Sequence, residues 1–377
     1  MKDIKVIPVY LPQFHAIPEN DEWWGKGFTE WVNVKGAKPL FEGHNQPRVP
    51  LNDNYYNLLD VETLKWQCKL AKDHGIYGFC MYHYWFDGHL LLEKPVENYL
   101  KSDIDFPFCL CWPNEHWTNA WVSGENKVLI EQRYGSEKEW RDHYNYLVPF
   151  FKDSRYIRKS GKILFVIYRP ELISERKEMF ECWNRWAVED GIGEISFMFQ
   201  RPDVLINKPN EDMSMFDNVI EYQPYTAFLT KSRKNFSVLK KIKNNVGSFL
   251  EKHFKISAGD LRVARKTPVV YDYDELWSHI LSEKPLTDNS IPCAFVNWDN
   301  TPRRGANGSV IQGMTVEKFE FYLKKLIQKT RDEYKSDFLF MFAWNEWAEG
   351  GYLEPDDRNG TGYLQAIYNA LKDTGEL

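Results

Sequence analysis

Two glutamates that lie three residues apart are the side chains best suited to catalysis in this sequence. Glu346 and Glu349 belong to the segment Trp344-Asn345-Glu346-Trp347-Ala348-Glu349. Cleavage or transfer of a glycosidic bond usually needs two carboxyl groups, one protonated and one ionised. A helical turn would put residues i and i+3 on one side, and burial beside a second carboxylate separates two pKa values. On an exposed helix the same spacing is an ordinary surface pair, so its meaning depends on the fold.

Several other side chains could compete for a catalytic or metal-binding role. The carboxylates Glu30, Glu115, Glu221, Asp299 and Glu354 are interpreted as binders of sugar hydroxyls rather than as the acid or the base. The histidines show no metal-binding spacing such as H-E-x-x-H. The run Asp272-Tyr273-Asp274 fits the start of a helix, where acids are favoured. The sequence therefore predicts neither a metal nor a cofactor.

The elements that must position these groups are short apolar strands that alternate with helix-like segments. Such alternation predicts a parallel sheet, and eight strands fit an α/β fold with a single (β/α)8 TIM barrel over residues 1–377. A doubly wound sheet is the alternative, but no Gly-x-Gly-x-x-Gly follows the first strand. The expected strands are 4–10, 76–82, 106–112, 163–168, 194–199, 218–222, 291–298 and 338–344. The clearest expected helices are 62–74, 137–151, 175–190, 273–282 and 315–334.

Three long connections follow strands and therefore belong to the C-terminal face, where barrel enzymes keep their sites. They span residues 12–60, 114–137 and 224–270. The last is expected to hold a basic helical insertion at about 225–270, since Lys and Arg far outnumber acids there. It is interpreted either as a solvated face or as a clamp for an anionic substrate or a membrane-bound carrier phosphate.

Polar and aromatic residues gather at almost every strand end and in the loops beyond. Aromatic residues make up 16% of the chain, with 15 Trp, 21 Tyr and 24 Phe. Aromatic rings suit the apolar faces of sugars, and hydroxyl groups removed from water need hydrogen-bond partners. These strand ends and loops predict a saccharide-binding cleft. The residues expected to bind substrate are Tyr10, Gln13, Trp31, His83, Tyr84, Trp85, Trp112, Asn114, Glu115, Trp117, Tyr168, Arg169, Glu221, Asn297, Asp299, Arg303, Asn345, Trp347 and Glu354.

Composition and charge limit the partners and the cellular location that we expect for this chain. The formal net charge of -6, without a dominant basic run, argues against nucleic acid as the main partner. The first residues lack the features of a signal peptide, and no apolar stretch approaches the roughly 20 residues of a membrane span. The six cysteines form no C-x-x-C pair. We therefore expect reduced thiols, a cytoplasmic location and a monomer.

Several long motifs are similar to those of the WbsX family, encoded in bacterial surface-polysaccharide clusters. They lie at residues 10–15, 23–31, 78–86, 301–305 and 343–350, so the resemblance spans almost the whole chain. The family's fold resembles that of glycoside hydrolase family 99, the endo-α-mannosidases and endo-mannanases. That family carries an Asn-Glu-Trp-His-Glu-Gly segment, which this chain matches at 345–350 except at Ala348.

The resemblance implies roles for the two glutamates. Glu346 would act as base on the sugar 2-hydroxyl, giving an epoxide-like intermediate with retention, and Glu349 would be the general acid/base. This chain departs from the pattern at Ala348, and it lacks the Arg and Asp that related WbsX sequences often carry in the stretch matching 118–122. The second departure indicates a different sugar.

Three functions are carried forward from the sequence. The first is an enzyme that cleaves or transfers a glycosidic bond in a bacterial surface polysaccharide, with an oligosaccharide or polysaccharide as substrate. The second is a sugar-donor-dependent glycosyltransferase of O-antigen or capsule biosynthesis. For either enzyme, a peripheral membrane or lipid-carrier contact through the basic insertion is expected. The third is a non-catalytic saccharide-binding barrel.

Overall fold

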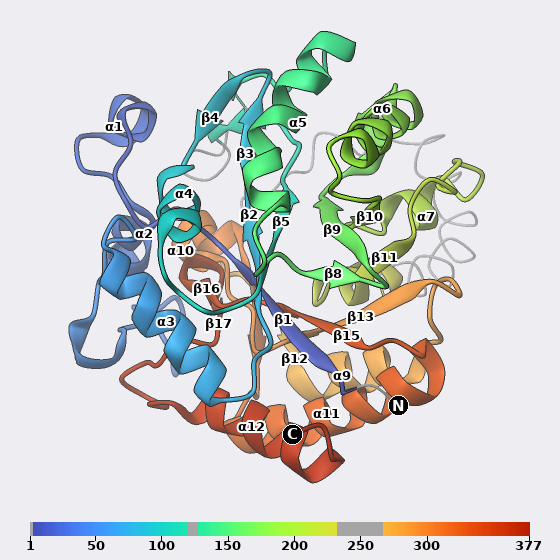
Figure 1. The fold of residues 1–377 in the computed structure, drawn as a ribbon. Coiled ribbons are helices and arrows are strands. Elements are labelled where there is room, and N and C mark those ends of the chain that lie inside the picture. The colour runs from blue at the N-terminus through green and yellow to red at the C-terminus, as the bar shows by residue number, and fades with distance from the viewer. Residues whose placement is uncertain (1–2, 120–126, 232–266) are drawn as a thin grey trace, which may run out of the picture.

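The structure, a computed structural model, describes residues 3–119, 127–231 and 267–377, and its centre is a closed barrel (Figure 1). Eight parallel strands follow one another in the order β1-β2-β5-β9-β10-β11-β13-β15, and β15 pairs with β1 to close the ring. The predicted (β/α)8 barrel is thereby confirmed. The barrel strands are β1 (Lys5–Tyr10), β2 (Phe79–Tyr82), β5 (Phe108–Trp112), β9 (Lys162–Ile167), β10 (Ile195–Phe199), β11 (Asn218–Glu221), β13 (Ser290–Phe295) and β15 (Phe338–Phe342).

The strands are almost wholly buried because they are covered on both faces. Every residue of β5, β10, β13 and β15 is buried. Side chains fill the inside of such a barrel and helices cover its outside, so its strands are continuously apolar instead of alternating. This explains why the strands were recognisable in the sequence as short apolar runs.

The outer helices begin at capping residues that the sequence supplies. The Asp60 side chain accepts a hydrogen bond from the backbone N–H of Glu62 at the start of α3. Ser136 and Glu139 form a capping box at the start of α5, and Asp272 caps α9, as its Asp-x-Asp context predicted. The helices are α1 (Pro18–Trp24), α2 (Glu30–Gly36), α3 (Val61–Asp73), α4 (Lys94–Lys101), α5 (Glu137–Phe151), α6 (Arg176–Glu189), α7 (Asp203–Asn207), α9 (Tyr273–Ser282), α10 (Thr301–Arg304), α11 (Val316–Lys329) and α12 (Gly362–Thr374).

Short elements fill the connections beyond the strands. The one after β1 holds α1 and α2, which project to one side of the barrel in Figure 1. Of the expected basic insertion, residues 225–231 are helical, and 232–266 lie outside the described residues. The remaining strands are β3 (Tyr84–Phe86), β4 (His89–Leu91), β6 (Trp117–Thr118), β7 (Val128–Ile130), β8 (Arg158–Lys159), β12 (Val269–Asp272), β14 (Ser309–Gln312), β16 (Asn345–Glu346) and β17 (Gly351–Tyr352). Short 3-10 or π-helical turns are η1 (Leu51–Asp53), η3 (Pro170–Leu172), η4 (Gly305–Asn307), η5 (Thr330–Tyr334) and η6 (Trp347–Glu349).

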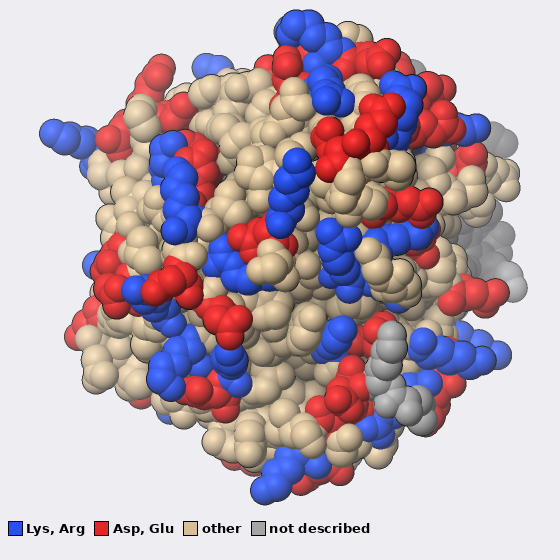
Figure 2. All heavy atoms as spheres, viewed as in Figure 1, with Lys and Arg blue, Asp and Glu red and all other residues tan. Residues whose placement is uncertain are grey.

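The two ends of the described chain meet at the amino-terminal side of the barrel (Figure 1). The backbone N–H of Ile4 donates to Glu376 Oε2 at 2.7 Å, and Glu376 also pairs with Arg331. On the face in Figure 2, acidic and basic side chains are interspersed. All six cysteines are free thiols. In the parts of the chain that are described, no helix has the length and apolarity to cross a membrane.

Candidate active site

A cavity of about 860 Å³ opens at the carboxyl ends of the barrel strands. All eight strands contribute to it, since a lining residue stands at or just beyond the end of each one. Ligand pockets of enzymes typically measure about 300–1,000 Å³. The wall residue at or beyond each strand end, in barrel order from β1, is Leu11, Tyr82, Pro113, Tyr168, Arg201, Tyr222, Trp298 and Phe342.

Glu346 and Glu349 both line this cavity. They lie close to each other because both contact Arg303. The guanidinium of Arg303 donates through Nη2 to Glu346 Oε1 at 2.9 Å, and its Nη1 lies 2.9 Å from Glu349 Oε1. The arginine side chain is only 2% exposed, against 5% for Glu346 and 18% for Glu349. The two carboxylates are therefore separated by no more than the width of one guanidinium group and its two contacts.

A third glutamate completes this cluster. Glu30, at the start of α2, accepts a hydrogen bond from Arg303 Nε at 2.9 Å. Its carboxylate also receives the side-chain amides of Gln13 at 3.3 Å and Asn33 at 3.0 Å. One buried cation is thus shared by three carboxylates from two segments, the start of α2 and the turn after β15.

The electrostatics of the glutamate pair favour two different protonation states. Burial raises the pKa of Glu346 well above its usual range, and the charge of Arg303 opposes that rise. Burial likewise raises the pKa of Glu349, again opposed by Arg303. Because neighbouring carboxylates disfavour each other's ionisation, such a pair can hold one proton between two groups at neutral pH. A shared proton suits acid–base work.

The turn that carries the pair is anchored from below by Glu354. The indole N–H groups of Trp344 and Trp347 donate to its carboxylate at 3.0 and 2.7 Å. Tyr56 Oη at 2.8 Å and Gln67 Nε2 at 2.7 Å supply two further hydrogen bonds. Burial raises the pKa of Glu354 to about 7, against these four hydrogen bonds. The tryptophans beside the catalytic candidates therefore point away from the cavity.

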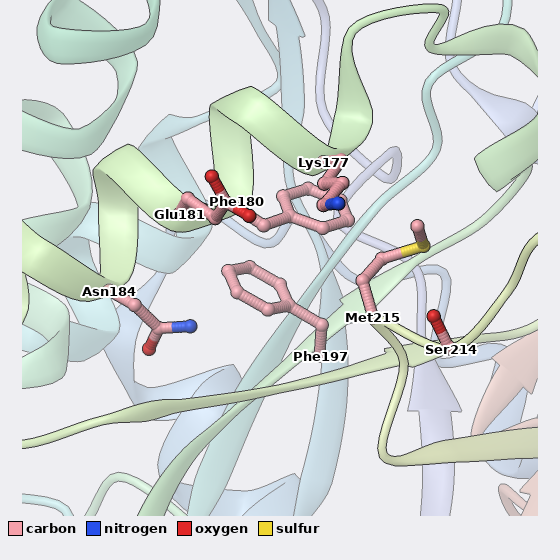
Figure 3. A pocket seen from close by; sticks show the side chains of 7 residues that line it. All are labelled: Lys177, Phe180, Glu181, Asn184, Phe197, Ser214 and Met215. Atoms are coloured by element: carbon pink, nitrogen blue, oxygen red, sulfur yellow. The ribbon is translucent and has the colours of Figure 1, made fainter.

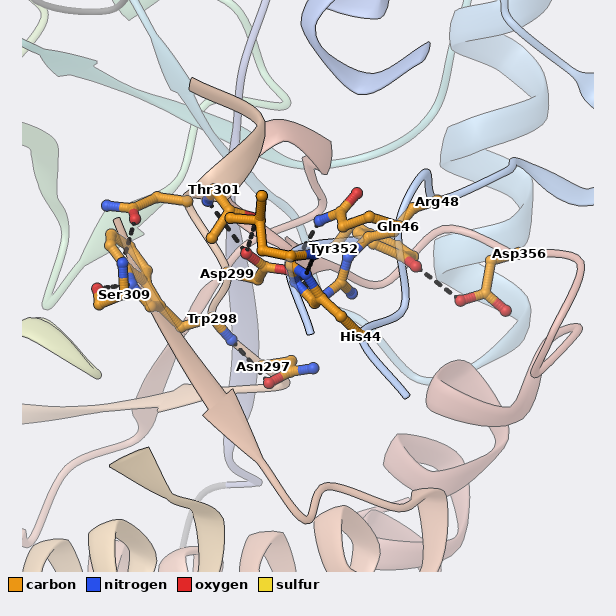
Figure 4. A network of polar contacts seen from close by, with 12 residues as sticks. His44, Gln46, Arg48, Asn297, Trp298, Asp299, Thr301, Ser309, Tyr352 and Asp356 are labelled. Atoms are coloured by element: carbon orange, nitrogen blue, oxygen red, sulfur yellow. Dashed lines mark hydrogen bonds and ion pairs between the residues drawn. The ribbon is translucent and has the colours of Figure 1, made fainter. Parts of the chain in front are cut away.

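Asp299 anchors the same turn from another side (Figure 4). Its backbone N–H donates to the carbonyl of Glu349 at 2.6 Å, and its side chain is fully buried. The carboxylate receives Gln46 at 2.7 Å, the Thr301 hydroxyl at 2.6 Å and lies 2.9 Å from His44 Nε2. These contacts lower the pKa of Asp299, outweighing the effect of burial, so the loop that follows β1 is tied to the turn through an ionised carboxylate.

The predicted binding residues divide into those that line the cavity and those that lie outside its lining. Seven line the cavity: Gln13, Tyr84, Glu115, Trp117, Tyr168, Arg169 and Arg303. The others lie outside its lining: Tyr10, Trp31, His83, Trp85, Trp112, Asn114, Glu221, Asn297, Asp299, Asn345, Trp347 and Glu354.

Half of the second group, including Asp299, Trp347 and Glu354 described above, hold in place the segments that carry the lining residues. Asn345 clamps the backbone of Leu11 through two hydrogen bonds of 2.8 and 2.9 Å, and Tyr10 donates to Gln67 at 2.7 Å. Asn114 bonds the backbone N–H and C=O of Arg169, each at 2.8 Å. These side chains fix the loops that carry the lining residues.

The other six predicted residues make their contacts elsewhere in the protein. His83 lies 2.9 Å from the ring nitrogen of His143, and Trp85 stacks on His143 at 4.6 Å. The indole of Trp112 donates to the carbonyl of Trp85 at 3.1 Å, and that of Trp31 to the carbonyl of Tyr56 at 2.9 Å. Glu221 accepts from Tyr334 Oη at 2.8 Å. Asn297 lies with Asp299 beside a separate cavity of about 430 Å³.

Some lining residues were absent from the predicted set. They come from α1 and its loop, from the ends of β10, β11 and β13, and from the loop after β5. Position at a strand end was the available signal for Arg201, Tyr222 and Trp298, and Trp24, Phe28 and Arg304 lie within the motifs shared with the WbsX family. The main ones are Trp24, Phe28, Tyr134, Arg201, Tyr222, Tyr225, Trp298 and Arg304.

A different cavity of about 430 Å³ lies between α6 and the segment before β11 (Figure 3). Phe180 and Phe197 stack there at 4.1 Å, and Lys177 and Glu181 stand at its rim. No carboxylate pair lines it, so the barrel mouth remains the candidate active site. In the described ranges, no group of three or more His, Cys, Asp or Glu side chains is placed to hold a metal ion.

A parallel barrel with paired carboxylates beneath aromatic walls has the organisation of a barrel enzyme that acts on carbohydrate. The chain belongs to the WbsX glycosyltransferase family, which it matches over residues 6–367. It is 34% identical over 374 residues to the protein WxcX of Xanthomonas campestris pathovar campestris strain B100. That alignment covers 97% of this chain and 49% of WxcX, so the chain spans about half the length of the curated relatives it matches.

Solved structures with the same fold include glycoside hydrolases. The GH99 endo-alpha-mannosidase of Bacteroides thetaiotaomicron superposes with a TM-score of 0.58 at 14% identity, covering 100% of this chain and 98% of that one. A glycoside hydrolase-like protein superposes with a TM-score of 0.56 at 13% identity, covering 98% and 94%. The resemblance in fold to family 99 is thus confirmed.

Proposed function

We propose that this chain cleaves or transfers a glycosidic bond within a bacterial surface polysaccharide, with Glu346 and Glu349 as the catalytic carboxyls. The observation that carries the proposal is the contact of both carboxylates with one buried guanidinium, that of Arg303, on the floor of an aromatic-lined cavity. Barrel enzymes act at this face, and glycosidic chemistry needs two carboxyl groups of different protonation.

A retaining route follows from the resemblance to family 99. Glu349, the more exposed carboxyl, donates its proton to the leaving oxygen as the bond from that oxygen to C1 breaks. Glu346 takes the proton of the sugar 2-hydroxyl, whose oxygen closes on C1. Water or an acceptor hydroxyl then opens the three-membered ring at C1, passing its proton to Glu349 while Glu346 returns its proton to O2.

The substitution at Ala348 is compatible with this route. Ala348 is fully buried and is not among the residues that line the cavity. The two glutamates and Arg303 therefore constitute the proposed acid–base apparatus without a side chain from position 348.

The test is turnover of α-mannan oligosaccharides and isolated bacterial O-polysaccharides, read by mass spectrometry. Glu346→Gln and Glu349→Gln should each lower turnover by at least about 100-fold, the usual contribution of a positioned acid or base. The matched control is Glu181→Gln, since Glu181 lies at the rim of the cavity in Figure 3. Wild-type activity in both active-site variants would refute the assignment.

A sugar-donor-dependent transferase is the second candidate, favoured by the description of the family as glycosyltransferases. A thermal-shift screen distinguishes the two, because a ligand that binds only the folded state raises the melting temperature. Stabilisation by a nucleotide sugar would favour transfer. Stabilisation by glycans without turnover would favour a binding barrel.

The proposal includes a monomeric, cytoplasmic enzyme that meets a lipid-carrier phosphate through its basic segment at 225–270. Size-exclusion chromatography with light scattering tests the monomer. Cell fractionation tests the location, and sedimentation with anionic vesicles tests the membrane contact. Binding to vesicles that persists at high salt would count against an electrostatic contact.

A further inference from the structure

The wall of the active-site cavity differs in charge between its two halves. The half that follows β1, β2 and β5 has no Lys or Arg among its described lining residues. Its rings include Trp24, Phe28, Tyr84 and Trp117, which offer apolar faces and polar edges to a sugar. Glu30 and Glu115 are the acids of this half.

The half that follows β9, β10, β11 and β13 carries the arginines. Besides Arg303, which its three glutamates occupy, Arg169, Arg201 and Arg304 line the cavity there. Because these strands are consecutive in the barrel, the three side chains come from one continuous arc of the wall. Glu346 and Glu349, from the loop after β15, stand at the boundary between the two halves.

These three arginines are not equally neutralised. Arg169 has two carboxylate partners at 2.7 Å, Glu115 and Glu171. Arg201 has one, Asp203 at 2.8 Å, which does not line the cavity. Arg304 is exposed and makes no ion pair in the parts of the chain that are described. The surplus positive charge of this half therefore resides on Arg304, close enough to Glu349 to lower the pKa of that carboxyl.

Arg201, which lines the same half of the cavity, is fixed in place by its neighbours. Its guanidinium lies over the ring of Tyr225 at 3.5 Å from the centroid and donates to Tyr168 Oη at 3.0 Å. A guanidinium fixed by stacking and by one carboxylate loses little freedom when it accepts a further ligand. It can offer hydrogen bonds to an anionic oxygen in a geometry set in advance.

We infer that this arginine-bearing half of the cavity binds an anionic group of the saccharide, through Arg304 and Arg201, while the other half binds an uncharged ring. The inference rests on the proposed saccharide function and names its substrate class. The shared chemistry is an oxyanion with several terminal oxygens next to the bond that reacts. A phosphate linked to the sugar and the carboxylate of an acidic sugar are its two sources.

Ligand-observed NMR titration of the full chain tests this without turnover. The probes are glucose, galactose and mannose, each as the neutral sugar, the uronate and the 1-phosphate. At least one anionic form should bind about tenfold more tightly than its neutral parent, the ratio that one charge-assisted hydrogen bond supplies. High salt should reduce the preference. A preference for the 1-phosphates alone identifies a sugar-linked phosphate, and one for the uronates alone identifies an acidic sugar.

Arg304→Gln should remove most of this preference without unfolding the chain, because the side chain is exposed. Arg358→Gln is the matched control, an exposed arginine outside this cavity. Equal binding of neutral and anionic forms, an unchanged preference in Arg304→Gln, or no binding of any anion would overturn the inference. If the Glu346 and Glu349 variants did not alter turnover, the catalytic assignment would be refuted instead. The preference for anionic sugars would be unaffected, because it does not depend on which residues catalyse the reaction.

Discussion

The guanidinium of Arg303 contacts both Glu346 and Glu349 and opposes the rise in their pKa values that burial causes. Lysine could not replace it, because an ammonium group lacks the planar fork that reaches separate carboxylates. Its three contacts of 2.9 Å are made from a side chain that is almost fully buried. In the proposed reaction, Arg303 would therefore act through the glutamates.

Replacing Arg303 should move the pH–rate profile as well as lower its height. Arg303 lowers the pKa of Glu346 and of Glu349. Arg303→Met should therefore raise both pKa values and shift both limbs of the kcat profile to higher pH, with kcat at neutral pH down by about 100-fold. The check is kcat against pH, with Arg358→Met as control. A profile that loses height without moving would contradict this role.

Glu354 illustrates that the sequence does not give the direction in which a side chain points. The sequence placed Glu354 near the catalytic face and Trp347 beside the catalytic candidates, and both were predicted to bind substrate. In the structure they bind each other beneath the cavity. Position along the chain gives the place of a residue at a strand end, but the direction of its side chain depends on turn geometry and on partners far away in sequence.

Removing the charge of Glu354 should cost stability. Glu354→Gln would turn an amide NH2 toward some of the four donors that now bind the carboxylate. We expect a loss of about 2–4 kcal/mol in the free energy of unfolding, measured by urea denaturation. Glu181→Gln, at an exposed position, should change it by less than about 0.5 kcal/mol. A loss in Glu354→Gln no larger than the control would disprove the anchoring role.

The turn from Trp344 to Gly350 is the element on which the site depends. Gly350 adopts a left-handed conformation with φ of 67°. A Cβ placed there would meet Arg48 Nη2 at 2.8 Å and the backbone nitrogen of Asp299 at 3.1 Å. The turn therefore fits closely against the network in Figure 4.

Alanine at this position should disturb catalysis through the turn. Gly350→Ala adds both backbone strain and crowding, so kcat should fall at least about tenfold and stability by more than about 1 kcal/mol. Gly360→Ala is the matched control, because its φ is 54° but nothing lies within 4 Å of the added atom. Thermal melts and turnover of both variants measure the difference. Equal behaviour would show that crowding against Asp299 is unimportant.

At the scale of secondary-structure elements, the sequence predicted the barrel strands better than the contacts made by the loops. All eight strands were predicted at their places, because burial on both faces leaves a continuous apolar run. Differences are confined to ends: 291–298 was expected where β13 is Ser290–Phe295, since the chain leaves the sheet to line the cavity at Trp298. The contact of Glu30 with Arg303 spans 273 residues, and no local pattern could indicate it.

Across the whole molecule, the barrel is closed by the pairing of β1 with β15, and the chain ends are joined beside that seam. Ile4 and Arg331 both contact the carboxylate of Glu376, which is buried. Glu376 therefore links the start of β1 to the segment after α11 and to the last residues.

Loss of this link should loosen the barrel without altering the site. Glu376→Ala removes the acceptor of Ile4 and the partner of Arg331, so the free energy of unfolding should fall by about 1–3 kcal/mol. KM should be unchanged, because the cavity lies at the other end of the strands. Asp373→Asn, at an exposed ion pair with Lys324, is the control and should cost less than about 1 kcal/mol. The urea concentrations at the midpoint of unfolding of the two variants test this prediction.

The support beneath the catalytic turn bears on how such proteins diverge. Glu354, Asn345 and Asp299 hold the turn without forming any part of the wall of the main cavity. On the proposed function, mutations at wall positions other than Arg303, Glu346 and Glu349 can therefore change the sugar that is bound without disturbing the catalytic turn. Under that proposal, a lineage could follow a changing surface polysaccharide while inheriting one reaction, and a laboratory library restricted to those wall positions should keep its members active.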